Sequence, residues 1–183
     1  MIDAPERPTP RFPASRVDYV RAQIRDKLAL RTGNLVGVSS AADGADLLFI
    51  EEVLAREGRV VVFLPFGIAD FEQTSVKEAW RARFRRALAA PGVELREPLY
   101  PSLPATQEGQ NRAFAEVNAA IVATAEALAG SLHDQDPWFL AVYQRAKTDQ
   151  QGGTGDAFGD WTKKGRTLVT IDPMGNPDSV CPE

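Results

Sequence analysis

The sequence predicts an α/β fold in which short apolar strands alternate with amphipathic helices around a doubly wound, mainly parallel sheet. Three observations lead to this class. Residues 59–64 are β-branched and almost uninterrupted, as in a central parallel strand that is buried on both faces. Helical patterns, with apolar residues three and four positions apart, lie on either side of this strand. Strands and helices alternate at the rhythm of right-handed crossover units.

The first part of the chain predicts an arm, a helix and one strand–helix unit. Residues 1–13 carry four prolines and no periodicity, so they should form a loop or an extended arm. A helix is expected to begin near Ser15, as its N-cap, and to end by Gly33. A short strand over 35–38 and a helix over about 43–57 should follow, and Gly58 should end that helix.

The rest of the chain continues the alternation. After the strand at 59–64 and a loop, the pattern predicts a helix over 76–89, a weak strand at 93–95, a proline-rich loop at 98–106, a helix over 107–128, a strand at 139–143, a helix over 156–164 and a strand at 167–171. We therefore expect one domain over residues 1–173 and a C-terminal tail over 174–183.

The order of the elements has one irregularity. Domains of this architecture usually open with a strand that carries the first ligand-facing loop, whereas this sequence opens with an arm and a helix. We therefore expect the first strand to be missing from the N-terminus. Either the true start lies upstream of Met1, or a partner chain or another segment fills that position in the sheet. An unfilled position would leave strand edges unpaired.

Composition limits the function. With 183 residues, 44% of them apolar, the chain is long enough for one well-buried domain. The net charge of −4 argues against a nucleic-acid partner, since such binding depends on an excess of Lys and Arg. The single cysteine, Cys181, and the single histidine, His133, argue against a disulfide and a metal site, and we expect no cofactor.

The sequence also gives an expectation about location. It has no uninterrupted apolar run of the roughly 18 residues that a membrane helix needs. Its first residues have neither the basic region nor the apolar core of a signal peptide. We therefore expect no membrane partner and a cytoplasmic protein.

The most informative segment is the turn between the strand at 35–38 and the following helix. Small and polar residues fill it, and the free N–H groups of the helix start would point toward an anion. We expect Ser39, Ser40, Asp43, Gly44 and Asp46 to bind a ligand there. The alternative is that the same residues are only a helix cap on a small-residue packing face.

A second group of candidate residues follows other predicted strands. Asp70 comes after the strand at 59–64, and Gly152, Gly153 and Thr154 come after the strand at 139–143. Both segments would lie at the carboxyl edge of the sheet, where open α/β proteins bind ligands. The glycine-rich segment is equally consistent with a flexible loop. Four arginines, at positions 81, 83, 85 and 86, could clamp a phosphate or bind an acidic partner, although a solvated helix surface explains them more simply.

Several segments together resemble the SLOG superfamily, the Rossmann-like group that contains Lonely Guy hydrolases, the DNA-uptake protein DprA and nucleotide-sensing domains. The likeness is greatest to bacterial sensor-type members and covers nearly the whole chain. It is carried by residues 1–5 with 11–13, 37–46, 62–66 with 70–71 and 75–76, and 80–84. The resemblance implies a three-layer Rossmann-like domain, and an apolar strand directly before the Met-Ile-Asp segment.

The resemblance also bears on catalysis. In the hydrolase branch, the second loop reads Pro-Gly-Gly-x-Gly-Thr and a catalytic glutamate follows. Here Gln151 stands at the proline, Asp156 at the threonine and Gly159 at the glutamate. The resemblance therefore implies no catalytic residue in that register, and it favours a binding module over an enzyme.

The expected function is the binding or sensing of a nucleotide or a nucleotide-derived small molecule, in a bacterial signalling module. One alternative is an N-glycosidic phosphoribohydrolase that acts on nucleoside monophosphates, which would need a pocket carboxylate in an activating role. Another is a structural or oligomerising module with a relic pocket. The resemblance implies a homodimer or an effector partner.

Overall fold

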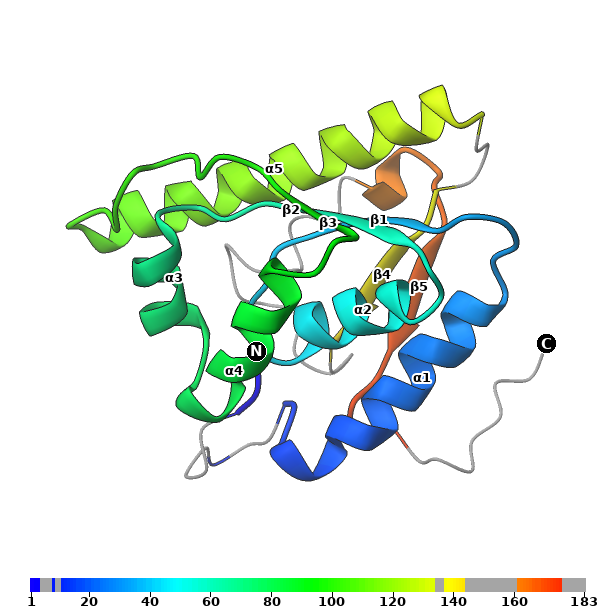
Figure 1. Cartoon of the computed structure of the whole chain (residues 1–183), viewed down its shortest axis with the longest axis horizontal. Helices are drawn as coiled ribbons and strands as arrows, with labels where there is room; N and C mark the ends of the chain where they lie inside the picture. Colours follow the sequence, from blue (N-terminus) through cyan, green and yellow to red (C-terminus); the bar gives the residue numbers. More distant parts are fainter. Residues whose placement is uncertain (4–7, 9–10, 134–136, 144–160, 176–183) are drawn as a thin grey trace.

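The structure, a computed structural model, describes residues 1–3, 8, 11–133, 137–143 and 161–175. It is a mixed structure of helices and parallel strands, as the sequence predicted (Figure 1). The elements in chain order are η1 (Ala14–Arg16), α1 (Val17–Ala29), β1 (Val36–Ser39), α2 (Ala45–Leu54), β2 (Arg59–Val62), α3 (Ile68–Ser75), α4 (Glu78–Leu88), β3 (Val93–Leu95), α5 (Gln107–Ser131), β4 (Phe139–Val142) and β5 (Leu168–Ile171).

The described strands form two parallel sheets. One has the order β1-β2-β3, and β4 pairs with β5 in the other. The central position of β2 confirms the prediction for this apolar run, because Val60 and Val62 are fully buried and Val61 is 5% exposed. Within the described residues, β1 pairs only with β2, and β4 pairs only with β5.

The two sheets contribute to the same hydrophobic core. Val60 and Val62 of β2 and Ile171 of β5 belong to one cluster of buried side chains, and Leu140 and Val142 of β4 pack against that cluster. Helices α1, α2 and α4 lie on one side of the strands, and α5 runs along the other side (Figure 1). The strand ends that carry the candidate residues are therefore positioned by a shared core.

Helix α1 follows the predicted apolar stripe, because Val20, Ile24 and Leu28 are its buried residues. Its start differs from the prediction. Ser15 lies inside the 3-10 helix η1, and no side-chain hydrogen bond caps η1 or α1. A serine before an apolar stripe is a good N-cap signal, but the tight turn that follows Pro13 takes up that position.

Helix α3 lies where a loop was expected. It has eight residues, of which only Phe71 and Ser75 are buried, so no apolar periodicity marks it in the sequence. The ring of Phe71 anchors the helix between Phe66 and Phe84, with ring centroids 6.1 Å and 5.9 Å away. Tertiary contacts therefore hold this helix in place.

Helix α2 ends at Leu54, earlier than predicted, and the residue in the left-handed region is Glu57, with a φ of 57°. Gly58 follows that residue and contributes to the helix end, because its N–H donates to the carbonyl of Val53 at 3.0 Å. A Cβ there would lie 2.8 Å from the carbonyl oxygen of Val53 and 2.9 Å from that of Leu35. The glycine therefore lets the end of α2 approach the chain that leads into β1.

Candidate functional site

The turn between β1 and α2 brings five of the predicted residues together at the carboxyl end of β1. The carbonyl of Ser39 accepts a hydrogen bond from the N–H of Phe63, at 3.0 Å, which ties the end of β1 to β2. Ser39 and Ser40 are half-buried, and neither hydroxyl has a hydrogen-bonding partner within the part of the chain that the structure describes. Within the described residues, these two hydroxyls therefore keep their hydrogen-bonding capacity unused.

The carboxylate of Asp43 is engaged within the fold. It is 1% exposed, and it accepts hydrogen bonds from the backbone N–H of Ile2, at 2.8 Å, and of Lys77, at 2.9 Å. The ammonium of Lys77 lies 3.4 Å from the same carboxylate and also donates to the carbonyl of Ile2. Asp43 thus joins the N-terminal arm, the start of α2 and the start of α4.

Gly44 is fitted to the N-terminal arm. Its φ is 90°, and a Cβ there would lie 3.2 Å from both the backbone nitrogen of Ile2 and the ring of Phe12. Ile2 and Phe12 are 5% and 4% exposed, so the arm is packed onto the start of α2. The carboxylate of Asp3 closes the arm by accepting hydrogen bonds from the backbone N–H groups of Arg11 and Phe12.

Asp46 lies in the first turn of α2 and is half-buried. Its Oδ2 accepts a hydrogen bond from the N–H of Ala42 at 3.2 Å, and its Oδ1 accepts none within the described residues. Burial raises the pKa of Asp46 above its ordinary value, and the charge of Asp43 adds to this. The Met1 amine and the Ala42 N–H lower the pKa, but they do not outweigh the burial.

Asp70 lies apart from this group. Its Oδ2 accepts a hydrogen bond from the N–H of Leu103 at 2.8 Å, so it ties α3 to the proline-rich loop. Ser75, at the other end of α3, accepts a hydrogen bond through its carbonyl from the N–H of Asp43, at 3.1 Å. The five residue steps from Asp70 to Ser75 correspond to about 7.5 Å along a helix, so α3 separates Asp70 from the β1–α2 turn.

Three of the predicted residues, Gly152, Gly153 and Thr154, lie outside the described residues. The described part of the chain has no group of three or more His, Cys, Asp or Glu side chains placed to hold a metal ion. It does have a hollow of about 220 Å³, but this lies at the first residues of β1, β2 and β3. None of the predicted site residues lines it.

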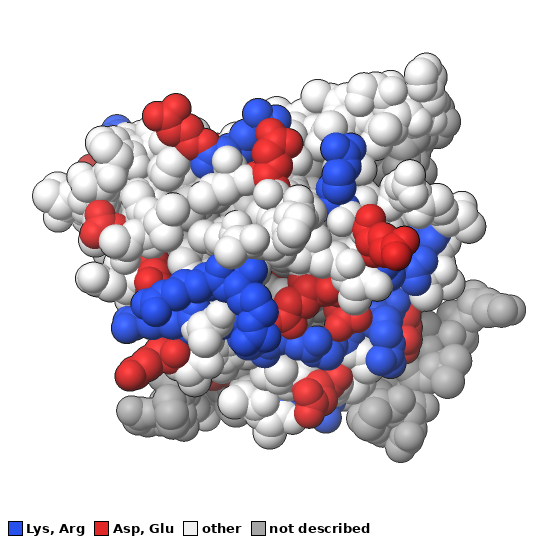
Figure 2. All heavy atoms as spheres, in the orientation of Figure 1, with Lys and Arg blue, Asp and Glu red and all other residues white. Residues whose placement is uncertain are grey.

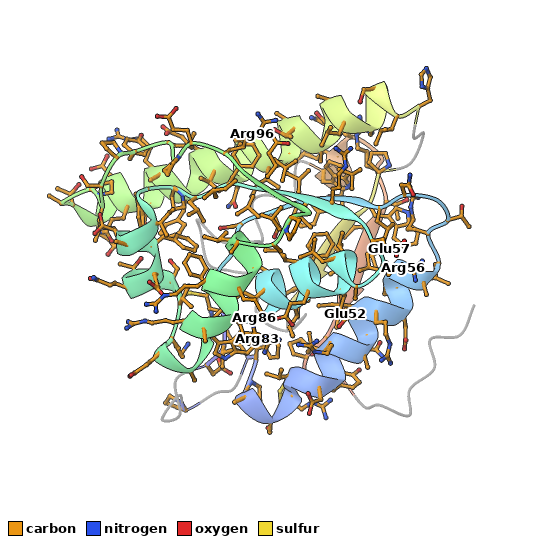
Figure 3. The ribbon with its side chains drawn as sticks, viewed as in Figure 1. Glu52, Arg56, Glu57, Arg83, Arg86 and Arg96 are labelled. Atoms are coloured by element: carbon orange, nitrogen blue, oxygen red, sulfur yellow. The ribbon has the colours of Figure 1, made fainter. Side chains whose placement is uncertain are left out.

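Sequence reasoning missed an ion-pair network on the outer side of α2. Glu51 receives a two-pronged contact from Arg83, whose Nε lies 2.8 Å from Oε1, and it also pairs with Arg21. Arg21 reaches Glu52 as well, at 3.2 Å. Figure 3 shows Arg83 and Glu52 in the region where α4 and α2 approach α1, and Figure 2 shows acidic side chains there bordered by basic ones. No local pattern signals these pairs, because about 30 residues separate the partners.

The network explains one of the four arginines, which was expected on a solvated surface. The guanidinium of Arg83 also lies 4.2 Å from the ring centroid of Trp80, so this side chain is held from two directions. Burial raises the pKa of Glu51, but the hydrogen bonds and charges of Arg83 and Arg21 outweigh it, and the pKa lies below its ordinary value. Arg83 is therefore engaged within the fold.

Helix α5 bears on location. Its 25 residues are long and apolar enough to cross a membrane by length and composition alone, and 17% of its most apolar 18-residue window is buried. This single helix is a weak indication of membrane insertion, since soluble proteins also contain helices of this length and composition.

Comparison with known proteins adds no relative. No protein-family model, no curated protein and no solved structure matches the chain. The structure itself defines the class as an α/β protein with parallel sheets.

Proposed function

We propose that the protein binds a nucleotide or a nucleotide-derived small molecule at the carboxyl end of β1, as a ligand-sensing module. The observation that carries this proposal is the pair of half-buried hydroxyls of Ser39 and Ser40, which have no partner within the described residues. They lie at the carboxyl end of β1, on the turn that leads to α2 at Ala45, where backbone N–H groups of the first helical turn have no partner inside the helix. Hydroxyls and free N–H groups together suit a phosphate.

Asp46 supplies the second half of the recognition. Its Oδ1 is free within the described residues and can accept a hydrogen bond from a sugar hydroxyl. A carboxylate beside a phosphate would normally repel it, but the raised pKa of Asp46 makes the neutral form easier to reach. Asp43, whose carboxylate is occupied by Ile2 and Lys77, supports the turn.

The fold proposal is a Rossmann-like, three-layer domain in which the two sheets are parts of one doubly wound sheet. It is supported by the edges of β1 and β4, which have no strand partner among the described residues, and by the core that both sheets share. One strand position would then lie between β1 and β4. An experimental structure tests this, because two strand spacings require the two strands to lie about 9–10 Å apart. A direct β1–β4 pairing, or a much wider separation, would refute it.

The functional test is thermal denaturation of the purified protein with AMP, ADP-ribose, NAD, cyclic dinucleotides and ribose 5-phosphate. A ligand that binds the folded state raises the melting temperature by mass action, and saturation at about 100 times Kd adds about 2.7 kcal/mol. Each mixture is then analysed by chromatography. A rise with an unchanged ligand supports the sensor. The absence of any rise, up to millimolar ligand, contradicts it and favours a structural module.

A second candidate, phosphoribohydrolase activity on nucleoside monophosphates, is favoured by one observation. A carboxyl group with a raised pKa beside a candidate ligand site is the kind of group that serves as a general acid, and Asp46, in the first turn of α2, is such a group. Release of free base from AMP in the same mixtures supports the hydrolase. A loss of that release in Asp46→Asn that exceeds its loss of affinity would assign the step to this residue.

A further inference from the structure

The N-terminal arm docks on the turn between β1 and α2 through a few contacts. Both backbone groups of Ile2 are held there. Its N–H donates to the Asp43 carboxylate at 2.8 Å, and its carbonyl accepts from the ammonium of Lys77. Ile2 and Phe12 are almost fully buried, and the first residues of the chain lie beside α2 and α4 (Figure 1). No described residue of the arm takes part in a strand pairing, so the arm can leave the turn without breaking either sheet.

One carboxylate closes the arm on itself. Asp3 accepts hydrogen bonds from the N–H groups of Arg11, at 2.5 Å, and Phe12, at 2.7 Å. The N–H of Asp3 donates in turn to the carbonyl of Phe12 at 2.9 Å. These bonds place the Phe12 ring against Gly44, where a Cβ would lie 3.2 Å from it. They involve neither the serine hydroxyls nor the Asp46 oxygen that are proposed to bind the ligand.

The segment that the arm holds joins the two halves of the proposed ligand site. Ser39 and Ser40 lie before this segment, and the first turn of α2 with Asp46 lies after it. Gly44 is the N-cap of α2 and no side chain caps the helix, so local capping does not fix the helix start. Asp43 supplies the contacts that do so, with the arm on one side and the end of α3 on the other. Docking of the arm therefore sets the spacing between the serine hydroxyls and the N–H groups of α2.

The docked arm leaves the proposed ligand groups free. With Ile2 and Phe12 in place, the hydroxyls of Ser39 and Ser40 and the Oδ1 of Asp46 have no partner within the described residues. The arm and a ligand can therefore be bound at the same time, and both favour the same conformation of the turn. Thermodynamic linkage makes such an effect reciprocal, because each binding event strengthens the other by the same factor.

We propose that the arm regulates the ligand site: its docking through Asp43 prepares the turn for a phosphorylated ligand, and the bound ligand in return locks the arm in place. This inference rests on the proposed function and adds to it the part of the chain that responds to the ligand. Asp43 is a positioning residue here, because its carboxylate is occupied by Ile2 and Lys77. A coupling of about 10-fold lies within the usual range for two linked sites.

Hydrogen exchange of the full chain, with and without AMP, tests the locking. The amides to follow are those that donate hydrogen bonds in the docked arm, namely Ile2, Asp3, Arg11 and Phe12. Saturating AMP, or ADP-ribose as a second probe, should slow their exchange by about 10-fold. The amide of Leu30, which is bonded to Lys27 at the end of α1, is the control and should not change.

Three outcomes of this experiment would overturn the inference. If AMP or ADP-ribose raises the melting temperature but the arm amides exchange as before, the inference fails and the proposed function stands. Faster exchange of the arm amides with the probe would show that the arm and the ligand compete. If neither probe raises the melting temperature at millimolar concentration, the inference and the proposed function fail together.

Variants of the arm test the reverse direction. Asp3→Ala should weaken AMP binding by about 10-fold in isothermal titration, because it loosens the arm and leaves the groups proposed to bind the ligand in place. Asp18→Ala is the matched control, since Asp18 is exposed on α1 and should leave the affinity unchanged. Phe12→Ala should match Asp3→Ala, and Phe12→Leu, which keeps an apolar side chain, should restore most of the affinity. Circular dichroism checks that each variant is folded. A folded Asp3→Ala chain that binds AMP as tightly as the parent chain would overturn the inference.

Discussion

Arg83 of α4 donates hydrogen bonds from two of its nitrogens to the carboxylate of Glu51 on α2, and its guanidinium lies over the ring of Trp80. Because Arg21 of α1 holds the same carboxylate, three helices on one side of the strands share one charged centre. The side chain of Glu51 is 26% exposed and that of Arg83 is 23% exposed, so water screens this contact only in part.

Glu51→Gln should destabilise the protein by about 1–3 kcal/mol at about pH 7, because Arg83 loses its charged partner and Arg21 keeps only Glu52. The folded-state pKa of Glu51 is lowered, so its contribution is present above the unfolded value near 4.5 and is lost as the pH falls through the folded value. Urea denaturation over a pH series measures this.

Arg85→Gln is the matched control for this network. Arg85 pairs with Glu72, but its side chain is 69% exposed, so the expected loss is below about 1 kcal/mol. Equal losses for Glu51→Gln and Arg85→Gln, or a Glu51→Gln loss that persists at about pH 3, would contradict the account of the buried network.

Asp46→Asn should raise the melting temperature at neutral pH and weaken ligand binding. Burial raises the pKa of this carboxyl in the folded state, so its ionised form is less stable there than in the unfolded chain. Asparagine keeps an acceptor for the Ala42 N–H and removes the charge. Calorimetry at about pH 7 and about pH 3 tests this, and the gain should disappear at the lower pH because both states are then protonated.

Asp43→Asn should behave in the opposite way and destabilise the protein by about 2–4 kcal/mol, because a buried acceptor of several hydrogen bonds loses its charge and one acceptor oxygen. Chemical denaturation gives the free energy of unfolding. The backbone N–H groups of Ile2 and Lys77 donate to the Asp43 carboxylate, so hydrogen exchange should show these two amides losing protection first. Retention of wild-type stability would mean that these bonds contribute little.

Gly44→Ala should cost about 2–3 kcal/mol, since it combines a left-handed backbone position with a Cβ that meets Ile2 and Phe12. Gly33→Ala isolates the cost of the left-handed backbone position from the cost of the steric contact. Gly33 has a φ of 81° but nothing within 4 Å of its Cβ position, so about 1 kcal/mol is expected there. The difference between the two variants measures how tightly the arm is packed, and equal losses would mean that the arm yields.

Ser39→Ala and Ser40→Ala should each weaken the binding of a phosphorylated ligand by about 5- to 10-fold, the equivalent of one hydrogen bond, with little change in the stability of the free protein. Isothermal titration with the ligand found in the melting screen measures the affinity. The two proteins should melt within about 1 °C of the parent chain when no ligand is present. A loss of stability without a loss of affinity would make these serines part of the helix cap.

The strands were predictable where their side chains are apolar in an unbroken run, because burial on both faces leaves no other pattern. The run that forms β2 is the example. Helix α3 was not predictable, because one aromatic side chain, Phe71, anchors it through contacts with Phe66 and Phe84. The surrounding core determines where α3 lies, and the sequence of α3 therefore shows no periodic pattern of apolar residues.

The position of the β1–α2 turn was predictable, whereas the contacts of its residues were not. A strand, small residues and a helix start located Ser39 through Asp46, and the structure keeps them together. The partner of Asp43 is the N-terminal arm, 41 residues away in sequence, which no local pattern reveals. The same is true of Glu51 and Arg83, 32 residues apart, whose pairing depends on how α2 and α4 pack.

The arm that Asp43 holds also influences the charge of the turn, although burial has the larger effect on Asp46. By fixing Ile2, it keeps the Met1 amine close enough to lower the pKa of Asp46. Acetylation of that amine, or any residue joined before it, removes the positive charge from this spot. The carboxyl of Asp46 would then take up a proton more readily, so a purification tag at this end changes the chemistry of the turn even when it leaves the fold intact.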